Sequence, residues 1–400
     1  MNSYPGWIAY VGPFSFPYGQ AASRRVYGNS KSLLWAGYDV VVVSGDIAPK
    51  SCEMVASENG KTLRHIGVNE LQPGSCLLKK IWTQLFSWGS RTTSWLSNQP
   101  SKPRCVVLYG GLSAYAWNIY RWGKKNNVPV IVDIVEWYDP SQMPGGRMGP
   151  FYLSSNFALR VLYPMFDGAI VISQYLANHF APKIPVLRIP PTVDFPYVQN
   201  ERLSSDDVLR LVYAGTPGKK DLLDCIIRAV VSVSRHKEIH LSIYGPSAQD
   251  LSEICGGDIP SVVSSCGRVS QYEVFEAVRW ADFSIFIRES LRFTEAGFPT
   301  KFVESLALST PVITNMTSDI GLYLRDGYNG VIVNTPDEEG VIEALLKASS
   351  YSLIEKMNMR KNALDTAHEC FSYINFADQL KDFIALFNGG SADAVRGVVK

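Results

Sequence analysis

The sequence predicts an α/β protein made of two doubly wound domains with parallel sheets. Short β-rich apolar runs recur along the chain, each run is followed by a turn and a helical pattern, and the scheme starts again in the second half. Apolar runs that alternate with helices are typical of parallel strands buried on both faces. A chain of 400 residues also exceeds the size of about 250 residues at which a single core stops growing, so two domains are expected.

The strands of the first half are expected at a series of apolar runs that begins with WIAYVG. These runs are residues 7–12, 39–45, 105–111, 128–135 and 168–173. The second half is expected to repeat the scheme at residues 209–217, 239–246, 283–289, 310–315 and 330–334. The N-terminal domain is therefore expected to cover residues 1–190, and the C-terminal domain residues 207–370.

The connection between the domains is predicted at residues 191–206, because Pro191 and Pro196 forbid a regular helix there and a polar stretch follows. Residues 371–388 place apolar side chains with a helical period and predict an amphipathic helix. The glycine-rich end that follows this helix is expected to be a loose tail.

Charge and cysteine content exclude several classes of function. The 38 basic and 37 acidic residues give a net charge of +1, so a nucleic acid partner is not expected. The seven cysteines are scattered without a CxxC pair, and no histidine lies at zinc-ligand spacing, which favours reduced thiols, a cytoplasmic location and no bound metal. The sequence predicts neither a secretory leader nor a transmembrane helix, since it has no apolar run of about 18 residues.

Ligands of open α/β sheets bind outside the carboxyl ends of the strands, so the loops after strands are the candidate sites. Gly19 follows the first strand and precedes a helical pattern. A glycine there lets a ligand approach the backbone, and the N–H groups at the start of the helix can bind a phosphate. The alternative interpretation is a plain turn between a strand and a helix.

A second loop, in the segment LVYAGTPGKKDLL, brings small residues and cations to the start of a helix. Gly215 and Thr216 follow the strand, and Lys219 and Lys220 follow them. Two lysines at a helix start oppose the helix dipole, so phosphate binding explains them better than a structural role does. The loop lacks the GxxxxGK[ST] spacing of a P-loop.

The third candidate is AGFPTKFVESLALSTPVITN, residues 296–315. At 100° per residue Lys301, Glu304 and Ser305 share one side of an otherwise apolar helix. Thr300 is expected to cap the N-terminus of this helix. Lys301 suits a phosphate and Glu304 suits paired ribose hydroxyls, as a nucleotide diphosphate sugar would require. The alternative is an exposed ion pair worth a few tenths of a kcal/mol.

With these loops the sequence resembles the retaining glycosyltransferases of the GT-B fold, in particular family 4 and its bacterial polysaccharide and lipopolysaccharide members. The resemblance runs from Trp7 to Phe387. The most specific motif is AGFPTKFVESLALSTPVITN followed by TSDIGLYLRDGYNGVIV, and the segments GQAASRR, DGAIVISQYL, YAGTPGKKDLL and GRVSQYEVFEAVRWADFSIFIRE occur in the same order as in the family.

The resemblance implies two Rossmann-like domains that face each other across a cleft, with a C-terminal helix that crosses back to the first domain. It implies a nucleotide sugar held by the C-terminal domain and a saccharide or lipid-linked acceptor held by the N-terminal domain. It also implies retention of the anomeric configuration, with the departing phosphate accepting the proton of the acceptor. Lys219, Lys220 and Lys301 are expected to stabilise that phosphate, so no metal and no further cofactor are expected.

The sequence departs from the family pattern at two places. Where the family has a first glutamate that contacts the sugar, this chain has Ala296, with Glu295 one position earlier, and Lys301 or Arg288 is expected to compensate. Where a histidine is common, this chain has Val135. Asp133 and Glu136 are therefore candidates for positioning the acceptor hydroxyl, with a structural role for each as the alternative.

Residues 77–96 interleave Lys79, Lys80 and Arg91 with tryptophan and phenylalanine. A basic aromatic stretch of this kind suits the surface of an anionic membrane, so peripheral contact with the inner face of the cell membrane is expected. The alternative is a helix that packs its aromatic rings into the domain core.

Two other functions remain open at this stage. A non-hydrolysing nucleotide-sugar epimerase would isomerise the donor without an acceptor. A non-catalytic partner of another transferase, made plausible by Ala296, would neither turn over alone nor be stabilised by nucleotides.

Overall fold

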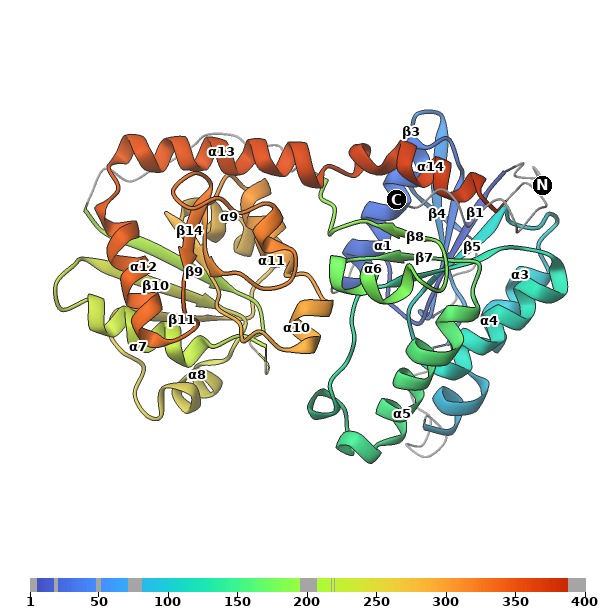
Figure 1. The fold of residues 1–400 in the computed structure, drawn as a ribbon, viewed down its shortest axis with the longest axis horizontal. Helices are drawn as coiled ribbons and strands as arrows, with labels where there is room; N and C mark the ends of the chain where they lie inside the picture. Colours follow the sequence, from blue (N-terminus) through green and yellow to red (C-terminus); the bar gives the residue numbers. More distant parts are fainter. Residues whose placement is uncertain are drawn as a thin grey trace. The chain divides into compact units, whose positions relative to one another are not determined.

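The computed structural model describes residues 6–17, 21–47, 52–70, 81–194, 207–216, 218 and 220–387. The chain divides into two compact units, the first made of Met1–Thr192 with Tyr373–Lys400 and the second of Val193–Ser372 (Figure 1). The boundary between Thr192 and Val193 falls near the start of the predicted linker, residues 191–206. Residues 195–206 lie outside the described part of the chain.

The first unit is built on one sheet with the strand order β3-β4-β2-β1-β5-β6-β7-β8. Its strands are β1 Ile8–Val11, β2 Val40–Ser44, β3 Glu53–Glu58, β4 Lys61–Gly67, β5 Cys105–Tyr109, β6 Val130–Ile134, β7 Gly168–Val171 and β8 Val186–Arg188. All neighbours pair in parallel except β3, which is antiparallel to β4. The central strands are buried on both faces, as their apolar composition predicted.

The sequence pattern missed three strands of this sheet, and each for a physical reason. β3 and β4 form a partly exposed hairpin whose polar residues hide the period of a strand. β8 is an edge strand of three residues, too short for any period to be recognised.

The helices of the first unit cover the sheet and carry the connections between strands. They are α1 Ala21–Trp35, α3 Ser90–Ser97, α4 Ser113–Asn126, α5 Pro150–Phe157 and α6 Gln174–Phe180, with short turns η1 Thr83–Ser87, η2 Pro140–Gln142, η3 Gly146–Met148, η4 Ala158–Leu162 and η5 Tyr163–Met165. α5, η4 and η5 follow one another without a break, so residues 150–165 form one helical segment.

The second unit is built on a parallel sheet with the order β11-β10-β9-β12-β13-β14. Its strands are β9 Leu209–Ala214, β10 Ile239–Tyr244, β11 Val263–Gly267, β12 Phe283–Ile285, β13 Val312–Asn315 and β14 Gly330–Val333. In order of sequence this is the doubly wound arrangement 3-2-1-4-5-6, whose switch point lies between β9 and β12. The sequence pattern missed β11, because most of its residues are serine, cysteine and glycine.

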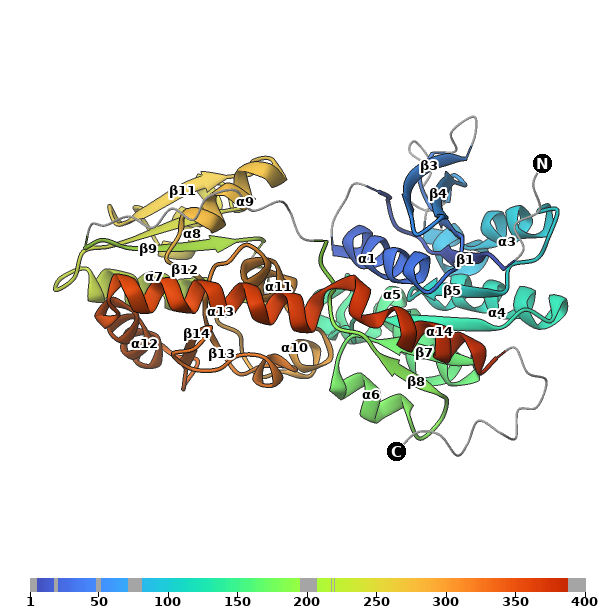
Figure 2. The same ribbon diagram turned by 90° about the horizontal axis from the view of Figure 1, so that it is seen from above.

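Helices lie on both faces of this second sheet, as Figure 2 shows. They are α7 Leu223–Val233, α8 Ala248–Cys255, α9 Gln271–Trp280, α10 Arg292–Ala296, α11 Thr300–Ala307, α12 Glu338–Ser350 and α13 Leu353–Phe371, with the turn η6 Ile320–Leu322. The longest of them, α13, packs against α11.

The prediction of a C-terminal helix at residues 371–388 is confirmed in part, because the α-helix is shorter than the predicted range. α13 ends at Phe371, Ser372 is extended with ψ near 129°, and η7 Tyr373–Phe376 and α14 Ala377–Ala385 follow. η7 and α14 pack on α1 of the first unit, where Leu380, Phe383 and Ile384 join the core. The chain therefore returns to its first unit through its last described helix, although the amphipathic pattern alone did not reveal the break.

The prediction of one amphipathic stretch over residues 77–96 also needs correction. Residues 71–80, which include Lys79 and Lys80, lie outside the described part. From residue 81 onward Gly89 separates the helical segments η1 and α3. Its φ of +91° is a left-handed conformation that favours glycine. Trp88 is buried, whereas Trp82 and Phe86 are exposed. Within the described residues no helix combines the length and the apolar composition needed to cross a membrane.

Candidate functional site

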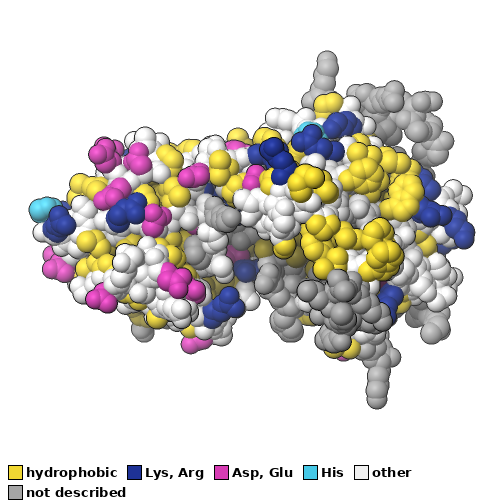
Figure 3. Space-filling model, turned by 90° about the horizontal axis from the view of Figure 1, so that it is seen from below, with side chains coloured by type: hydrophobic (Ala, Val, Ile, Leu, Met, Phe, Trp, Pro, Cys, Tyr) yellow, Lys and Arg dark blue, Asp and Glu magenta, His cyan; other side chains and the backbone are white. Residues whose placement is uncertain are grey.

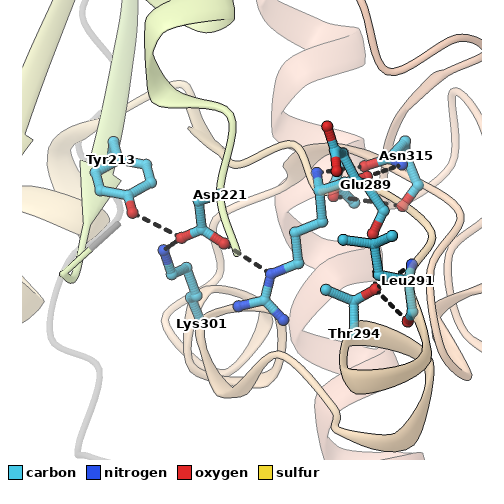
Figure 4. Close-up of polar contacts among 9 residues, drawn as sticks. Tyr213, Asp221, Glu289, Leu291, Thr294, Lys301 and Asn315 are labelled. Atoms are coloured by element: carbon cyan, nitrogen blue, oxygen red, sulfur yellow. Dashed lines mark hydrogen bonds and ion pairs between the residues drawn. The ribbon is translucent and has the colours of Figure 1, made fainter. Parts of the chain in front are cut away.

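A cluster of charged side chains lies at the carboxyl end of the second sheet, beside its switch point. Lys301, in the first turn of α11, forms an ion pair with Asp221, which lies in the loop after β9 (Figure 4). Tyr213, in β9, donates its hydroxyl to Asp221 Oδ2 at 2.6 Å. The Lys301 ammonium also lies 4.0 Å from the centre of the Tyr213 ring, close enough for a cation–π contact.

Arg288 adds a second cation from the other side of the switch point. Its Nε donates to Asp221 Oδ1 at 2.8 Å, and its guanidinium is mostly buried. The side chain of Asn315, at the end of β13, holds the backbone of Arg288 through its Oδ1 at 2.9 Å and its Nδ2 at 2.7 Å. A backbone hydrogen bond of 2.8 Å from Leu222 to Ile287 ties the two loops together. These bonds join the loops after β9 and β12 to the end of β13.

The cluster holds two cations against one carboxylate. Burial alone would raise the pKa of Asp221, but Lys301 and Arg288 outweigh it and hold that pKa below its usual value. Burial lowers the pKa of Lys301 to about 8, although Asp221 acts in the opposite direction and favours the charged form. Among Lys301, Arg288 and Asp221 the cations are in excess, although the Glu304 carboxylate one turn further along α11 also acts on Lys301.

Gly215 is required where it stands. It has φ of +139°, a conformation that side chains rarely allow, and a Cβ there would lie 3.2 Å from both Cε and Nζ of Lys301. The glycine therefore leaves the space that the lysine side chain fills. Thr216, the next residue, is exposed.

The predicted charged face of α11 is only partly correct. Lys301 and Glu304 are half-buried, but Ser305 is buried. The nearest partner of Lys301 is Asp221, and Glu304 contributes a weaker attraction that raises the lysine pKa. Thr300 is not the cap, because Pro299 occupies the cap position and Thr300 is the first helical residue. The ring of Pro299 fixes its φ, which is −73° here, and its ψ of 106° is extended.

The departure at Ala296 has a clear structural counterpart. Ala296 is fully buried in the core of the unit. Glu295 instead accepts hydrogen bonds from the Ser290 hydroxyl at 2.9 Å and the Ser318 backbone N–H at 3.0 Å. Its carboxylate thereby ties α10 to the loop after β13.

Of the three remaining residues predicted to bind the donor, the structure describes one. Lys220 is half-buried in the loop that carries Asp221. Gly19 and Lys219 lie outside the described residues, so their contacts with phosphate stay a prediction.

In the first unit the structure separates the two acidic candidates. Asp133, at the end of β6, is completely buried and pairs with the Arg25 guanidinium at 2.9 Å. It also accepts hydrogen bonds from Tyr10 and Asn29. Arg25 in turn donates to the backbone oxygen of Ile189 at 2.6 Å. These contacts favour a structural role for Asp133, because its buried carboxylate is bonded to side chains of β1 and α1.

Glu136 instead lines a cavity of about 610 Å³ at the carboxyl ends of β1, β5 and β6. Aromatic side chains dominate the wall: Phe14, Trp88, Tyr109, Tyr138 and Tyr163. Glu136 is the one charged side chain among the described lining residues. Burial, followed by the nearby Glu136 carboxylate, raises the pKa of Tyr138 well above its usual value, so this hydroxyl stays a hydrogen-bond donor.

Sequence reasoning missed Asp221, Tyr213 and Asn315. Asp221 directly follows two lysines, and this reversal of charge within a loop was the available signal. Tyr213 and Asn315 read as ordinary strand residues, and only the pairing of β9, β12 and β13 brings them to the cluster.

A known protein family matches part of the second unit. Residues 209–350 match the family model described as glycosyl transferases group 1. This range contains β9 to α12 and therefore the whole charged cluster. A comparison with curated proteins finds no match.

Solved structures similar to the chain extend over both units. Sucrose-phosphate synthase of Thermosynechococcus elongatus aligns with a TM-score of 0.71 at 14% identity, over 97% of this chain and 100% of the other. The catalytic domain of starch synthase IV of Arabidopsis thaliana, bound to ADP and acarbose, gives 0.70 at 12% over 96% and 99%. Anabaena HepE in complex with UDP and glucose gives 0.63 at 12% over 96% and 100%.

The two parallel sheets and these neighbours show the GT-B fold. The group 1 glycosyltransferase domain lies within the second unit, at residues 209–350.

Proposed function

We propose that the protein transfers a sugar from a nucleotide diphosphate sugar to a saccharide or lipid-linked acceptor, with retention of configuration and without a metal, in the synthesis of a surface polysaccharide. The observation that carries this proposal is the cluster of Lys301 and Arg288 around Asp221 at the switch point of the second sheet. The two cations lie together at the start of a helix, where a diphosphate can bind both of them.

The donor fits this cluster in a defined order. Lys301 and Arg288 bind the diphosphate, with the backbone N–H groups at the start of α11 directed at the same charge. Glu304, one turn further along α11, binds the ribose hydroxyls. Asp221 holds the two cations in place and favours the charged form of Lys301.

The complexes among the similar structures support a donor of this class. Anabaena HepE is described with UDP-glucose, and starch synthase IV with ADP. WaaG, with 15% identity and a TM-score of 0.60, is described as a glycosyltransferase involved in lipopolysaccharide biosynthesis, which favours a role in a surface polysaccharide.

The acceptor binds in the aromatic cavity of the first unit, where rings can stack on a sugar and Glu136 accepts a hydrogen bond from its hydroxyl. When the acceptor oxygen attacks the anomeric carbon, the bond from that carbon to the phosphate oxygen breaks. The departing phosphate accepts the acceptor's proton, and the cations of the cluster stabilise the remaining negative charge. Part of the 77–96 segment, with exposed Trp82 and Phe86, contacts the membrane.

A thermal-shift screen of UDP-, GDP- and dTDP-sugars, followed by product analysis, tests the function. A donor at a hundredfold excess over its Kd should stabilise the protein by about 3 kcal/mol. Lys301→Ala and Glu304→Ala should each fold normally and lose nearly all transfer, whereas Lys347→Ala, which removes a surface lysine paired with Asp326, should retain it.

Three outcomes would contradict the proposal. Normal transfer by both active-site variants would remove the cluster from the mechanism. Isomerisation of the donor without an acceptor would indicate an epimerase. The absence of stabilisation by every donor, together with no turnover, would indicate a non-catalytic partner.

A further inference from the structure

The helical segment of residues 150–165 in the first unit leaves an apolar face uncovered. Leu153, Phe157, Val161 and Met165 follow one another at intervals of four residues, and each side chain is between 41% and 49% exposed. The opposite side of the segment is buried, since Tyr152, Leu159 and Leu162 pack inward. Four large apolar side chains in register on one helix exceed the scattered exposure that is usual on a protein surface.

Neighbouring elements extend this face. α4 packs against α5, η4 and η1, and α5 packs against η1. α4 adds Trp117, which is 42% exposed. Trp82, just before η1, and Phe86 within η1 are 65% and 62% exposed, and their ring centres lie 4.4 Å apart. We call the exposed side chains of residues 82, 86, 117, 153, 157, 161 and 165 the apolar face. Figure 3 shows hydrophobic side chains gathered on this side of the first unit, with lysine and arginine at the margins.

The helical elements that form the apolar face carry charges of one sign. α4 carries Arg121, Lys124 and Lys125, and η4 carries Arg160. None of η1, α4, α5 and η4 contains an aspartate or glutamate. Lys124 is paired with Asp167, which lies beyond the segment. An apolar surface rimmed by cations complements a bilayer with anionic head groups, where rings and aliphatic chains enter the boundary of the acyl chains.

The same helical segment also faces the acceptor cavity. Ser155 and Leu159, on its inner side, line that cavity, whereas Phe157 and Val161 face outward. The π-helical turn η1, which begins just after exposed Trp82 and contains exposed Phe86, is followed directly by Trp88, which lines the cavity as well. One layer of helix therefore separates the apolar face from the cavity.

We propose that the apolar face docks the first unit on an anionic lipid bilayer and that the acceptor is carried by a lipid of that bilayer. The second part rests on the proposed function, because it takes the aromatic cavity as the acceptor site. The contact is broader than the 77–96 segment, since its central side chains belong to residues 150–165. Of the two acceptor classes in the proposed function, a saccharide or a lipid-linked molecule, docking on a bilayer favours the lipid-linked molecule.

Co-sedimentation with vesicles tests the docking without any donor. The protein should bind vesicles of phosphatidylglycerol and phosphatidylcholine, bind pure phosphatidylcholine weakly, and lose binding as salt rises. Phe157→Ser combined with Val161→Ser should reduce the affinity about tenfold or more. The control pair Ile354→Ser with Met357→Ser removes exposed apolar side chains of α13 in the second unit and should leave binding unchanged.

Several results would overturn the docking. One is failure of the wild type to bind anionic vesicles, and another is equal binding by the Phe157 and Val161 variant. A dimer in solution that this variant dissociates would show that a second copy covers the face. Stabilisation by the sugar nucleotide found in the thermal-shift screen should be the same for wild type and variant. If no sugar nucleotide stabilises the wild type, the proposed function fails while the vesicle result still decides the docking.

The lipid-linked class has its own test. A saccharide linked to undecaprenyl diphosphate in anionic vesicles should increase wild-type binding, and Glu136→Gln should reduce that increase without changing binding to vesicles that lack the lipid-linked saccharide. An equal effect of free saccharides on thermal stability, with none from the lipid, would overturn the assignment.

Discussion

Asp221 is the residue on which the charge of the proposed donor site depends. Its carboxylate contacts Lys301, Arg288 and Tyr213, and burial pushes the pKa of Lys301 down to about 8 while Asp221 opposes this shift. Phosphate binding needs the ammonium form, which is present below the pKa and is lost as pH rises through it. Wild-type donor affinity should therefore decrease as pH rises through about 8.

The Asp221→Asn variant should move this midpoint toward lower pH by about one unit or more, because burial then acts without the opposing carboxylate. Isothermal titration of the donor from pH 6 to 9 measures the midpoint. Asp224→Asn makes the same change of charge on the exposed face of α7, where Asp224 pairs with Arg228, and should leave it unchanged. Equal midpoints in wild type and Asp221→Asn would show that Asp221 does not set the charge of Lys301.

At the scale of elements, the Arg25–Asp133 pair joins α1 to β6 and, through Ile189 and Pro190, to the segment after β8. Removing one partner of a buried pair leaves the other charge without compensation. Asp133→Asn should therefore lower the free energy of unfolding by about 3 kcal/mol or more, measured by denaturant titration.

Glu136→Gln provides the matched comparison, since Glu136 lines the cavity of the same unit. It should change the free energy of unfolding by less than about 0.5 kcal/mol and reduce transfer. If Asp133→Asn instead folds as stably as the wild type and loses transfer, its carboxylate acts on the acceptor and the structural role is wrong.

At the scale of the whole molecule, the first unit is assembled from two distant parts of the chain. Leu380 in α14 is fully buried in a cluster with residues of β1 and α1. Leu380→Ala should lower the free energy of unfolding of the first unit by about 2–5 kcal/mol. Hydrogen exchange should then lose protection in β1 and α1 while β9 and β13 keep theirs.

Lys381→Ala changes the neighbouring exposed residue and should leave both units as protected as in the wild type. A uniform loss of protection in both units after Leu380→Ala would indicate that they unfold together, so that the division into two units has no energetic counterpart.

Much of the fold could be predicted from local pattern. Strands such as Val40–Ser44 and Val130–Ile134 are apolar on both faces, and a central parallel strand requires that composition whatever its neighbours are. The positions of Gly215, Lys301 and Glu304 after strands likewise follow from the rule for ligand sites in doubly wound sheets. The strands β3, β4, β8 and β11 were missed, because short or polar strands depend on their neighbours for stability.

The sequence by itself determined the α/β class, the two domains and the loops that carry the site, because these follow from the period of apolar residues and from glycine and proline. Only the tertiary structure decided which side chains contact the charged residues. It pairs Lys301 with Asp221, 80 positions away, and separates Asp133, sealed by Arg25, from Glu136, which lines a cavity. The reason is physical: a charge is set by the side chains that surround it, and strand order brings those together from distant parts of the chain.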